Sequence, residues 1–275
     1  MRGGPAVWRP GRPFALLLLL ASGAPAQVAP NRATRYLHPT DVTDARALWV
    51  NPAGLGRAEQ ASIHIDVTVG DPGSGGRLRQ LTTGLSSRGF ALGYQRDLFD
   101  SGVRGHTYRL GFAGGERRLA AGVAAALYRG GTSGTGWDVG VLYDLTPSLT
   151  LGATVANLGR PVVRDSTLPV TYTPGATLRL PGARAAFSAD AQMTADGVTG
   201  YAFGAAAELR HGTPLPLGIL LRVDTDRSLR RAAVAFGFSL GGQDLVGAVA
   251  TTPGDIGRLD AIGLYGVSTR RLARR

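Results

Sequence analysis

The sequence predicts an all-β fold, a transmembrane antiparallel β-barrel of about 14 strands that follows a short N-terminal hatch segment. Three observations lead to this prediction. The 275 residues include 41 glycines, about twice the usual share, and only 18% charged residues, which disfavours a soluble helical protein. An export signal opens the chain. From residue 61 onward, short segments place apolar side chains at every second position.

The composition also excludes several other classes of protein. The chain has no cysteine, so disulfide scaffolds, thiolate metal sites and cysteine nucleophiles are excluded. The apolar content of 44% is too high for a disordered chain. The formal charge of +11 comes from arginines that are spread along the chain without a cluster. That distribution is typical of a solvated or lipid-facing rim, and we expect no nucleic-acid partner.

Residues 1–26 have the order of a secretory signal peptide. Three arginines (Arg2, Arg9 and Arg12) precede an apolar run, and Ala24-Pro25-Ala26 is a small-residue cleavage site. The apolar run is too short to span a membrane as a helix, although a retained N-terminal anchor is the alternative. We expect the mature chain to start at Gln27. The protein is then exported, either as a soluble protein or as an outer-membrane barrel.

Residues 27–60 form the predicted periplasmic or hatch segment. Asp41 or Thr43 can cap a short helix there, and Pro52 ends that helix because it forces Asn51 into an extended conformation. Gly54 then permits a turn before the first strand.

Residues 61–269 form the predicted barrel. The pattern is plainest at the start, where Ile63, Ile65 and Val67 alternate with polar residues. The strands are expected near 61–69, 77–85, 88–97, 105–113, 118–128, 135–145, 148–157, 170–180, 183–193, 199–210, 215–225, 230–240, 243–252 and 259–269. The second, fifth and thirteenth show the pattern least clearly.

The connections between these strands fall into two groups. Those at one end are mostly tight turns such as Gly114-Gly115 and Pro181-Gly182, and those at the other end are longer and more polar, such as 158–168. This alternation predicts short periplasmic turns and longer outer loops, with both termini in the periplasm. A soluble β-sandwich would bury its apolar face and carry more charge on its exposed face. Residues 270–275 form a basic tail past the last strand.

The alternation also identifies the side chains that point into the barrel. If the apolar faces meet lipid, the charged residues between them line the lumen, because a charge on the lipid face is costly. These lumen-lining candidates are His64, Asp66, Asp138, Arg179, Asp190, Glu208, Arg210, Arg222 and Asp224. They either pack the lumen as arginine–carboxylate pairs or line a conduction path for small solutes.

The segment Asp44 to Gly56, DARALWVNPAGLG, resembles the N-terminal signature of the FadL-type outer-membrane transporters. Two later segments resemble the shorter PorV/PorQ-like branch of that superfamily: the hairpin at Tyr143–Pro147, and Asn157-Leu158-Gly159 with the following Leu168-Pro169. The resemblance implies a fourteen-stranded barrel with a hatch in or under the lumen. The hatch motif is Asn51, Pro52, Gly54 and Leu55. A periplasmic cap that only seals the barrel end is the alternative.

The sequence predicts no enzyme, no cofactor and no catalytic or metal-binding residue. The four histidines have no metal-ligand spacing, and the only serine–histidine pair, Ser101 with His106, falls in a predicted loop.

These features predict a bacterial outer-membrane barrel that admits or transports small hydrophobic or amphipathic molecules, gated by residues 30–56. The alternative is a PorV-like barrel that does not transport and acts as a scaffold or shuttle in protein secretion or surface attachment. A purely structural barrel is a third possibility. The expected partners are outer-membrane lipid and either a hydrophobic small molecule or a secreted protein.

Overall fold

The computed structural model describes residues 34, 36–70, 77–99, 102–116, 118–130, 132–163, 166–180, 182, 184–209, 216–230, 232–240, 245–252 and 255–271. The predicted signal peptide, Arg210 and the last four residues of the predicted basic tail lie outside the described residues. In the described part of the chain, no helix is long and apolar enough to cross a membrane.

Two short helices precede the strands: α1 (Ala47–Val50) and the 3₁₀ helix η2 (Pro52–Arg57). The long strands are β1 (Gln60–Gly70), β2 (Arg77–Ser87), β3 (Phe90–Leu98), β4 (Arg104–Glu116), β5 (Leu119–Gly130), β6 (Thr132–Asp144), β7 (Leu149–Leu158), β10 (Thr171–Arg179), β11 (Ala185–Thr194), β12 (Gly197–Glu208), β13 (Leu217–Asp226), β14 (Ala232–Leu240), β15 (Leu245–Thr252) and β16 (Asp255–Arg271). The short strands β8 (Val162–Val163) and β9 (Ser166–Thr167) form a hairpin on β6.

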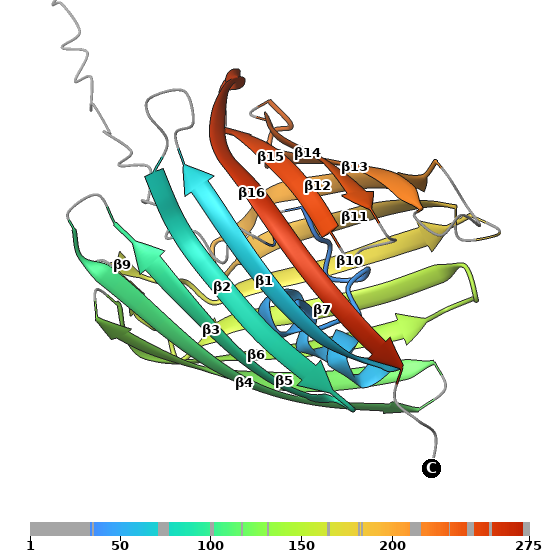
Figure 1. The fold of residues 1–275 in the computed structure, drawn as a ribbon, viewed down its shortest axis with the longest axis horizontal. Coiled ribbons are helices and arrows are strands. Elements are labelled where there is room, and N and C mark those ends of the chain that lie inside the picture. The colour runs from blue at the N-terminus through green and yellow to red at the C-terminus, as the bar shows by residue number, and fades with distance from the viewer. Residues whose placement is uncertain are drawn as a thin grey trace, which may run out of the picture.

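The 14 long strands close into an antiparallel barrel (Figure 1). Each pairs with its neighbour along the chain, and β1 pairs with β16 from Gln60↔Arg271 to Gly70↔Ala261. The predicted fold class is confirmed, and every predicted strand segment overlaps one long strand. We call the end with Gln60 and Arg271 the base, and the opposite end the top.

The outer face of the barrel is apolar. Ile63 and Ile65 are 57% and 54% exposed, whereas His64 and Asp66 between them are buried. On β6, Trp137, Val139 and Val141 are exposed in the same way. Aromatic rings pack across the outside of neighbouring strands, with centroids 5.4 Å apart for Phe90–Phe112 and 5.3 Å for Tyr94–Tyr108. A closed barrel with an apolar outer face is the architecture of an outer-membrane protein.

The predicted alternation of short and long connections is wrong in detail. The expected loop at 130–136 is almost entirely strand, because β5 ends at Gly130 and β6 begins at Thr132. The longest connection at the base runs from Glu208 to Leu217, which agrees with the sequence, where 211–214 is predicted as the one long connection of this group. Backbone pairing needs no apolar side chains, so strands continue through glycine-rich stretches where the side-chain pattern stops.

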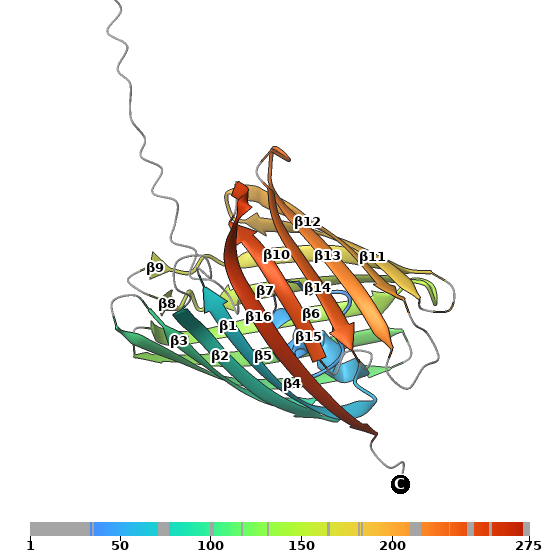
Figure 2. The same ribbon diagram turned by 45° about the horizontal axis from the view of Figure 1, so that its top comes forward.

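The N-terminal segment lies inside the barrel. The blue helices of this segment lie within the ring of strands in two views (Figures 1 and 2). We call residues 34 and 36–59 the plug. Its buried apolar side chains pack against the inner faces of β3 and β5, through Leu48, Leu55, Ala91 and Ala124. The sequence left open whether this segment is a hatch in the lumen or a cap at the barrel end. In the structure it lies within the lumen.

Candidate functional site

The motif Asn51-Pro52 turns the plug and attaches it to the wall. Asn51 is extended, with φ −150° and ψ 104°, and its Oδ1 accepts a hydrogen bond of 3.1 Å from the Ala53 amide at the start of η2. Its Nδ2 donates to the Pro39 carbonyl at 2.9 Å and to the Val141 carbonyl of β6 at 3.4 Å. Proline is well tolerated at the first helical position, because a backbone N–H there would have no acceptor within the helix.

The rest of the predicted hatch motif is buried with it. Leu55 is buried beside Leu48. Gly54 lies so close to the Val42 carbonyl that a Cβ would be 2.1 Å from the oxygen. The predicted cap at Asp41 or Thr43 is absent, because α1 is one turn long and begins after Arg46, which provides no side-chain cap.

A buried ionic cluster holds the first half of the plug. Arg46 is 1% exposed, and its Nη2 lies 2.5 Å from Asp44 Oδ2, while Nη1 donates to the Tyr36 hydroxyl. Burial raises the pKa of Tyr36 to about 12. Burial alone would raise the pKa of Asp44, but the charge and hydrogen bonds of Arg46 lower it below its ordinary value. Burial opposes the charge of Arg46, but its two partners raise its pKa, so it stays cationic.

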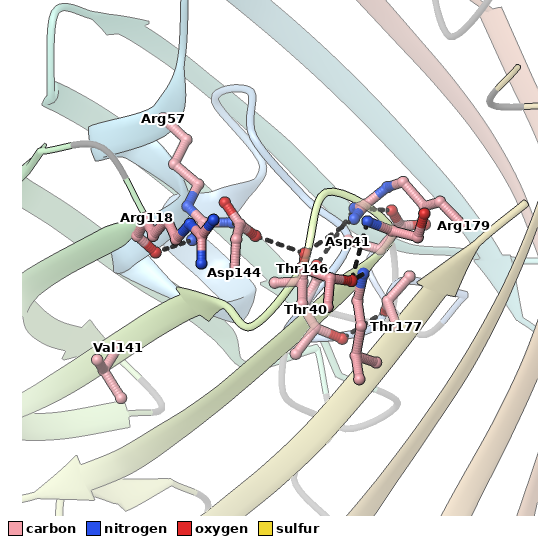
Figure 3. Close-up of polar contacts among 12 residues, drawn as sticks. Thr40, Asp41, Arg57, Arg118, Val141, Asp144, Thr146, Thr177 and Arg179 are labelled. Atoms are coloured by element: carbon pink, nitrogen blue, oxygen red, sulfur yellow. Dashed lines mark hydrogen bonds and ion pairs between the residues drawn. The ribbon is translucent and has the colours of Figure 1, made fainter. Parts of the chain in front are cut away.

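One group of polar contacts between the plug and the wall lies near the base (Figure 3). Arg179 of β10 donates to Asp41 at 2.6 Å. The hydroxyls of Thr40 and Thr177 lie 2.6 Å apart. On the other side of the plug, Arg57 pairs with Asp144 at 2.8 Å and donates to the Arg118 carbonyl at 3.0 Å. The plug is therefore tied to β10 and to the turns that follow β4 and β6.

Asp138 of β6 belongs to a second cluster, deeper in the lumen. Arg109 of β4 lies 2.5 Å from its carboxylate and also donates to the Leu48 carbonyl of the plug at 3.0 Å. The Arg109 guanidinium lies 5.0 Å from the centre of the Trp49 ring. Sequence reasoning missed Arg109, although it occupies the inward position between Tyr108 and Leu110, which both face outward.

A third cluster joins two predicted residues to the plug. Asp190 of β11 accepts a hydrogen bond of 2.7 Å from His38, and Arg222 of β13 lies 3.6 Å from its second oxygen. Arg222 also donates to Asp224 at 2.8 Å and to the Leu37 carbonyl of the plug. Glu208 does not join them, because it lies nearer the base.

His64 and Asp66 are buried on the inner face of β1, with His64 Nε2 3.5 Å from Asp66 Oδ2. Among the described residues, neither nitrogen of His64 and neither oxygen of Asp66 has a hydrogen-bond partner. In the same part of the chain, no three histidine or carboxylate side chains are grouped as metal ligands.

A cavity of about 300 Å³ lies near the base, between the plug and the wall from β11 to β14. Tyr36, Leu37, His38, Asp41 and Arg46 line it from the plug. Small side chains line it from the wall, including Gly204, Ala206 and Gly218. Charged residues of its lining include Arg179, Arg184 and Glu208. The site thus combines a lumen that holds the plug with a small cavity, mostly apolar on its wall side, on the base side of the plug.

Comparison with known proteins shows similarity at the level of structure. No family model matches the chain, and no curated protein matches it. The monoaromatic hydrocarbon channel CymD has a TM-score of 0.58 and 12% identity, over 88% of this chain and 97% of that one. The Ralstonia pickettii toluene transporter TbuX has a TM-score of 0.56 and 13% identity, over 88% and 98%. For the Pseudomonas putida toluene transporter TodX the values are 0.55 and 14%, over 88% and 98%. The chain therefore shares the β-barrel fold of these hydrocarbon-channel proteins.

Proposed function

We propose that this barrel transports small hydrophobic molecules across the bacterial outer membrane and that the plug gates the passage. One observation carries the proposal: a segment that is hydrogen-bonded to several strands lies within the lumen, next to a cavity large enough for a small ligand. Ligand cavities in proteins start at about 300 Å³. The toluene transporters and the hydrocarbon channel with the same fold support this class of cargo.

The predicted lumen-lining residues act in this proposal by holding the plug. Arg179 pairs with Asp41 of the plug, and Arg222 donates to the Leu37 carbonyl of the plug. Asp138 pairs with Arg109, which donates to the Leu48 carbonyl of the plug. Of the two roles predicted for these residues, this arrangement favours packing of the lumen by arginine–carboxylate pairs, not the lining of an open conduction path. Transport then requires these contacts to open, because the plug occupies the lumen between them.

A reversible cross-link tests the gate. The chain has no cysteine, so a pair introduced by Thr40→Cys and Thr177→Cys is the only thiol pair present. The two native hydroxyl oxygens lie 2.6 Å apart, which places the residues close enough for a disulfide between plug and wall. We expect oxidation to abolish toluene uptake into proteoliposomes, and a reductant to restore it.

The matched control is the pair Val123→Cys and Val139→Cys. These residues face each other on β5 and β6 and are exposed on the outer face of the barrel, so their disulfide joins two wall strands without touching the plug. Uptake should persist in the oxidised control. Uptake that persists in the oxidised Thr40–Thr177 variant would refute gating by the plug.

Membership in the FadL-type superfamily and its PorV/PorQ-like branch stays a prediction. The scaffold role in protein secretion also stays a prediction, and no contact or cavity described above favours it. Co-purification with surface-exported proteins, lost on substitution in the 158–168 connection, would support that role instead.

A further inference from the structure

The outer face of β3 and β4 changes from apolar to basic along its length toward the top. Its outward side chains are phenylalanine and leucine near the base, followed by a row of tyrosines and then a row of basic residues. In this order, the facing pairs are Phe90–Phe112, Leu92–Leu110, Tyr94–Tyr108 and Arg96–His106. Tyrosines on the outside of a membrane barrel are typical of the membrane–water interface, so the next row toward the top lies at the level of the lipid headgroups.

Three basic side chains form this row. His106 of β4 faces Arg96 of β3 on one side and Arg129 of β5 on the other, and we call these three residues the basic row. The His106 ring is held by the Tyr94 hydroxyl, which lies 2.8 Å from its Nδ1. Arg129 is exposed, and its Nη1 donates to the Tyr128 carbonyl at 2.9 Å. Because neighbouring strands lie about 5 Å apart, the two arginines leave the backbone about 10 Å apart on the same face.

No carboxylate on β3, β4 or β5 lies beside the basic row. These strands contain two carboxylates, Asp97 and Glu116. Asp97 faces the lumen and accepts hydrogen bonds from Gln80 and Gln95, while Glu116 ends β4 at the base. Among the described residues, the half-buried guanidinium of Arg96 has no hydrogen-bond partner. Like charges on neighbouring strands repel, so an anion from outside these strands would stabilise the row.

The basic row is at the end of the barrel that we expect to face outward. The longest connection, which runs from Leu158 to Thr171 and carries β8 and β9, is at the same end. Long connections are typical of the outer end of an outer-membrane barrel, so the lipid beside the row is that of the outer leaflet. An arginine on the lipid face costs little at the interface and much more at the midplane, which agrees with this depth.

We propose that the basic row binds the phosphate group of a lipid in the outer leaflet, with Arg96 and Arg129 donating to its oxygens. Arginine forms charge-assisted, often bidentate hydrogen bonds with phosphate, and two long side chains that start about 10 Å apart can reach one phosphate from both sides. The acyl chains of this lipid lie along the apolar rows toward the base. The site is on the outside of the barrel, so the inference is independent of transport through the lumen.

Binding of lipid A, a phosphorylated lipid of the bacterial outer leaflet, tests the proposal. Native mass spectrometry of the detergent-purified barrel measures its dissociation constant. Replacing both arginines, by Arg96→Gln with Arg129→Gln, should weaken binding about tenfold, because two charge-assisted contacts at a partly exposed site are lost. The matched control is Arg227→Gln with Arg230→Gln, which removes the same charge from exposed positions at the same end, between β13 and β14. The control should keep the affinity. Unchanged binding in the first variant, or equal weakening in both, would overturn the inference.

A second measurement uses the unmodified protein and covers the case in which the first variant does not fold. Lipid A should stay bound to the barrel, whereas the same lipid without its phosphates should not. Inorganic phosphate at the concentration of the lipid should not displace lipid A, because it lacks acyl chains to lie on the apolar rows. Equal retention of both lipids would overturn recognition of the phosphate, and displacement by inorganic phosphate would overturn the assignment to a lipid.

Discussion

Single glycines set how closely the plug approaches the wall. A Cβ on Gly140 of β6 would lie 1.9 Å from Asn51 Oδ1, far inside any allowed contact. At this position the missing side chain is what permits the hydrogen bonds of Asn51 to Ala53 and Val141. The glycine excess of the chain thus has a structural role at the surface between plug and barrel.

Gly140→Ala should displace the plug. The added methyl group cannot share the space of the Asn51 amide, and overpacking of this kind costs about 1–3 kcal/mol. A cysteine introduced by Ala47→Cys, at a position that is buried in the plug, reports the change through its rate of maleimide labelling. Gly140→Ala should speed labelling, whereas Gly114→Ala, where a Cβ meets nothing within 4 Å, should not. Equal labelling rates would contradict the close approach.

The buried pair Asp44–Arg46 makes the plug sensitive to acid. The folded pKa of Asp44 lies below its ordinary value of 3.8, so its stabilising effect is complete above that value and is lost as the pH falls through the lowered folded value. Asp44→Asn should remove this part of the acid dependence. It should also destabilise the protein at neutral pH by about 3–5 kcal/mol, because Arg46 keeps its charge without a carboxylate.

Thermal unfolding in detergent between pH 2 and 7 measures both effects of Asp44→Asn. The control is Asp196→Asn, at an exposed position in the turn between β11 and β12, which should leave the profile unchanged. A wild-type acid profile in Asp44→Asn would contradict the role of the pair.

At the scale of elements, the helices of the plug depend on the barrel. α1 has four residues and η2 has six, which is far too short for a helix that is stable in isolation. Their conformation is therefore fixed by contacts with β4, β5 and β6, and the plug has no independent fold. A segment of this kind can rearrange without unfolding the barrel, as gating requires.

The hairpin β8–β9 covers part of the top in a similar way. Val163 is buried against Ala126 and Tyr128 of β5, with Leu168 beside them. Val163→Asp should detach the hairpin, because a buried unpaired carboxylate is costly. Protease cleavage within residues 159–170 should become faster in this variant. Val162→Asp, at the less buried neighbouring position, should change the cleavage rate less, and equal rates would contradict the packing.

At the scale of the whole molecule, two surfaces of opposite polarity meet in the strands whose side chains the structure describes. Their outward side chains are mostly apolar, and the inward ones are mostly small or polar. This explains the low charge of the chain, since half of each strand faces lipid. Pairing between β1 and β16 closes the sheet. An open edge would leave backbone N–H and C=O groups without hydrogen-bond partners in lipid.

Arginine scanning of neighbouring positions on β13 tests this division. Leu221 is 43% exposed on the outer face, whereas Leu220, the preceding residue of the strand, is less exposed and has the opposite orientation. Leu221→Arg should destabilise the inserted barrel by about 2–4 kcal/mol, the cost of an arginine on the lipid face near the midplane. Leu220→Arg avoids lipid and should insert better, as measured by heat-modifiable mobility on gels. Better insertion of Leu221→Arg would reverse the assigned faces.

The sequence by itself determined the barrel, its 14 strands and the outward face of the clearest strands, because strand alternation is a local property with a period of two. It also identified Asp138, Asp190 and Arg222 as inward residues. Their partners could not be predicted: His38 is 152 residues from Asp190, and Leu37 is 185 from Arg222. Contacts between the plug and the wall depend on the depth and path of an irregular segment that no periodic pattern encodes. Only the tertiary structure therefore decided that the plug enters the lumen and leaves a cavity beside His38.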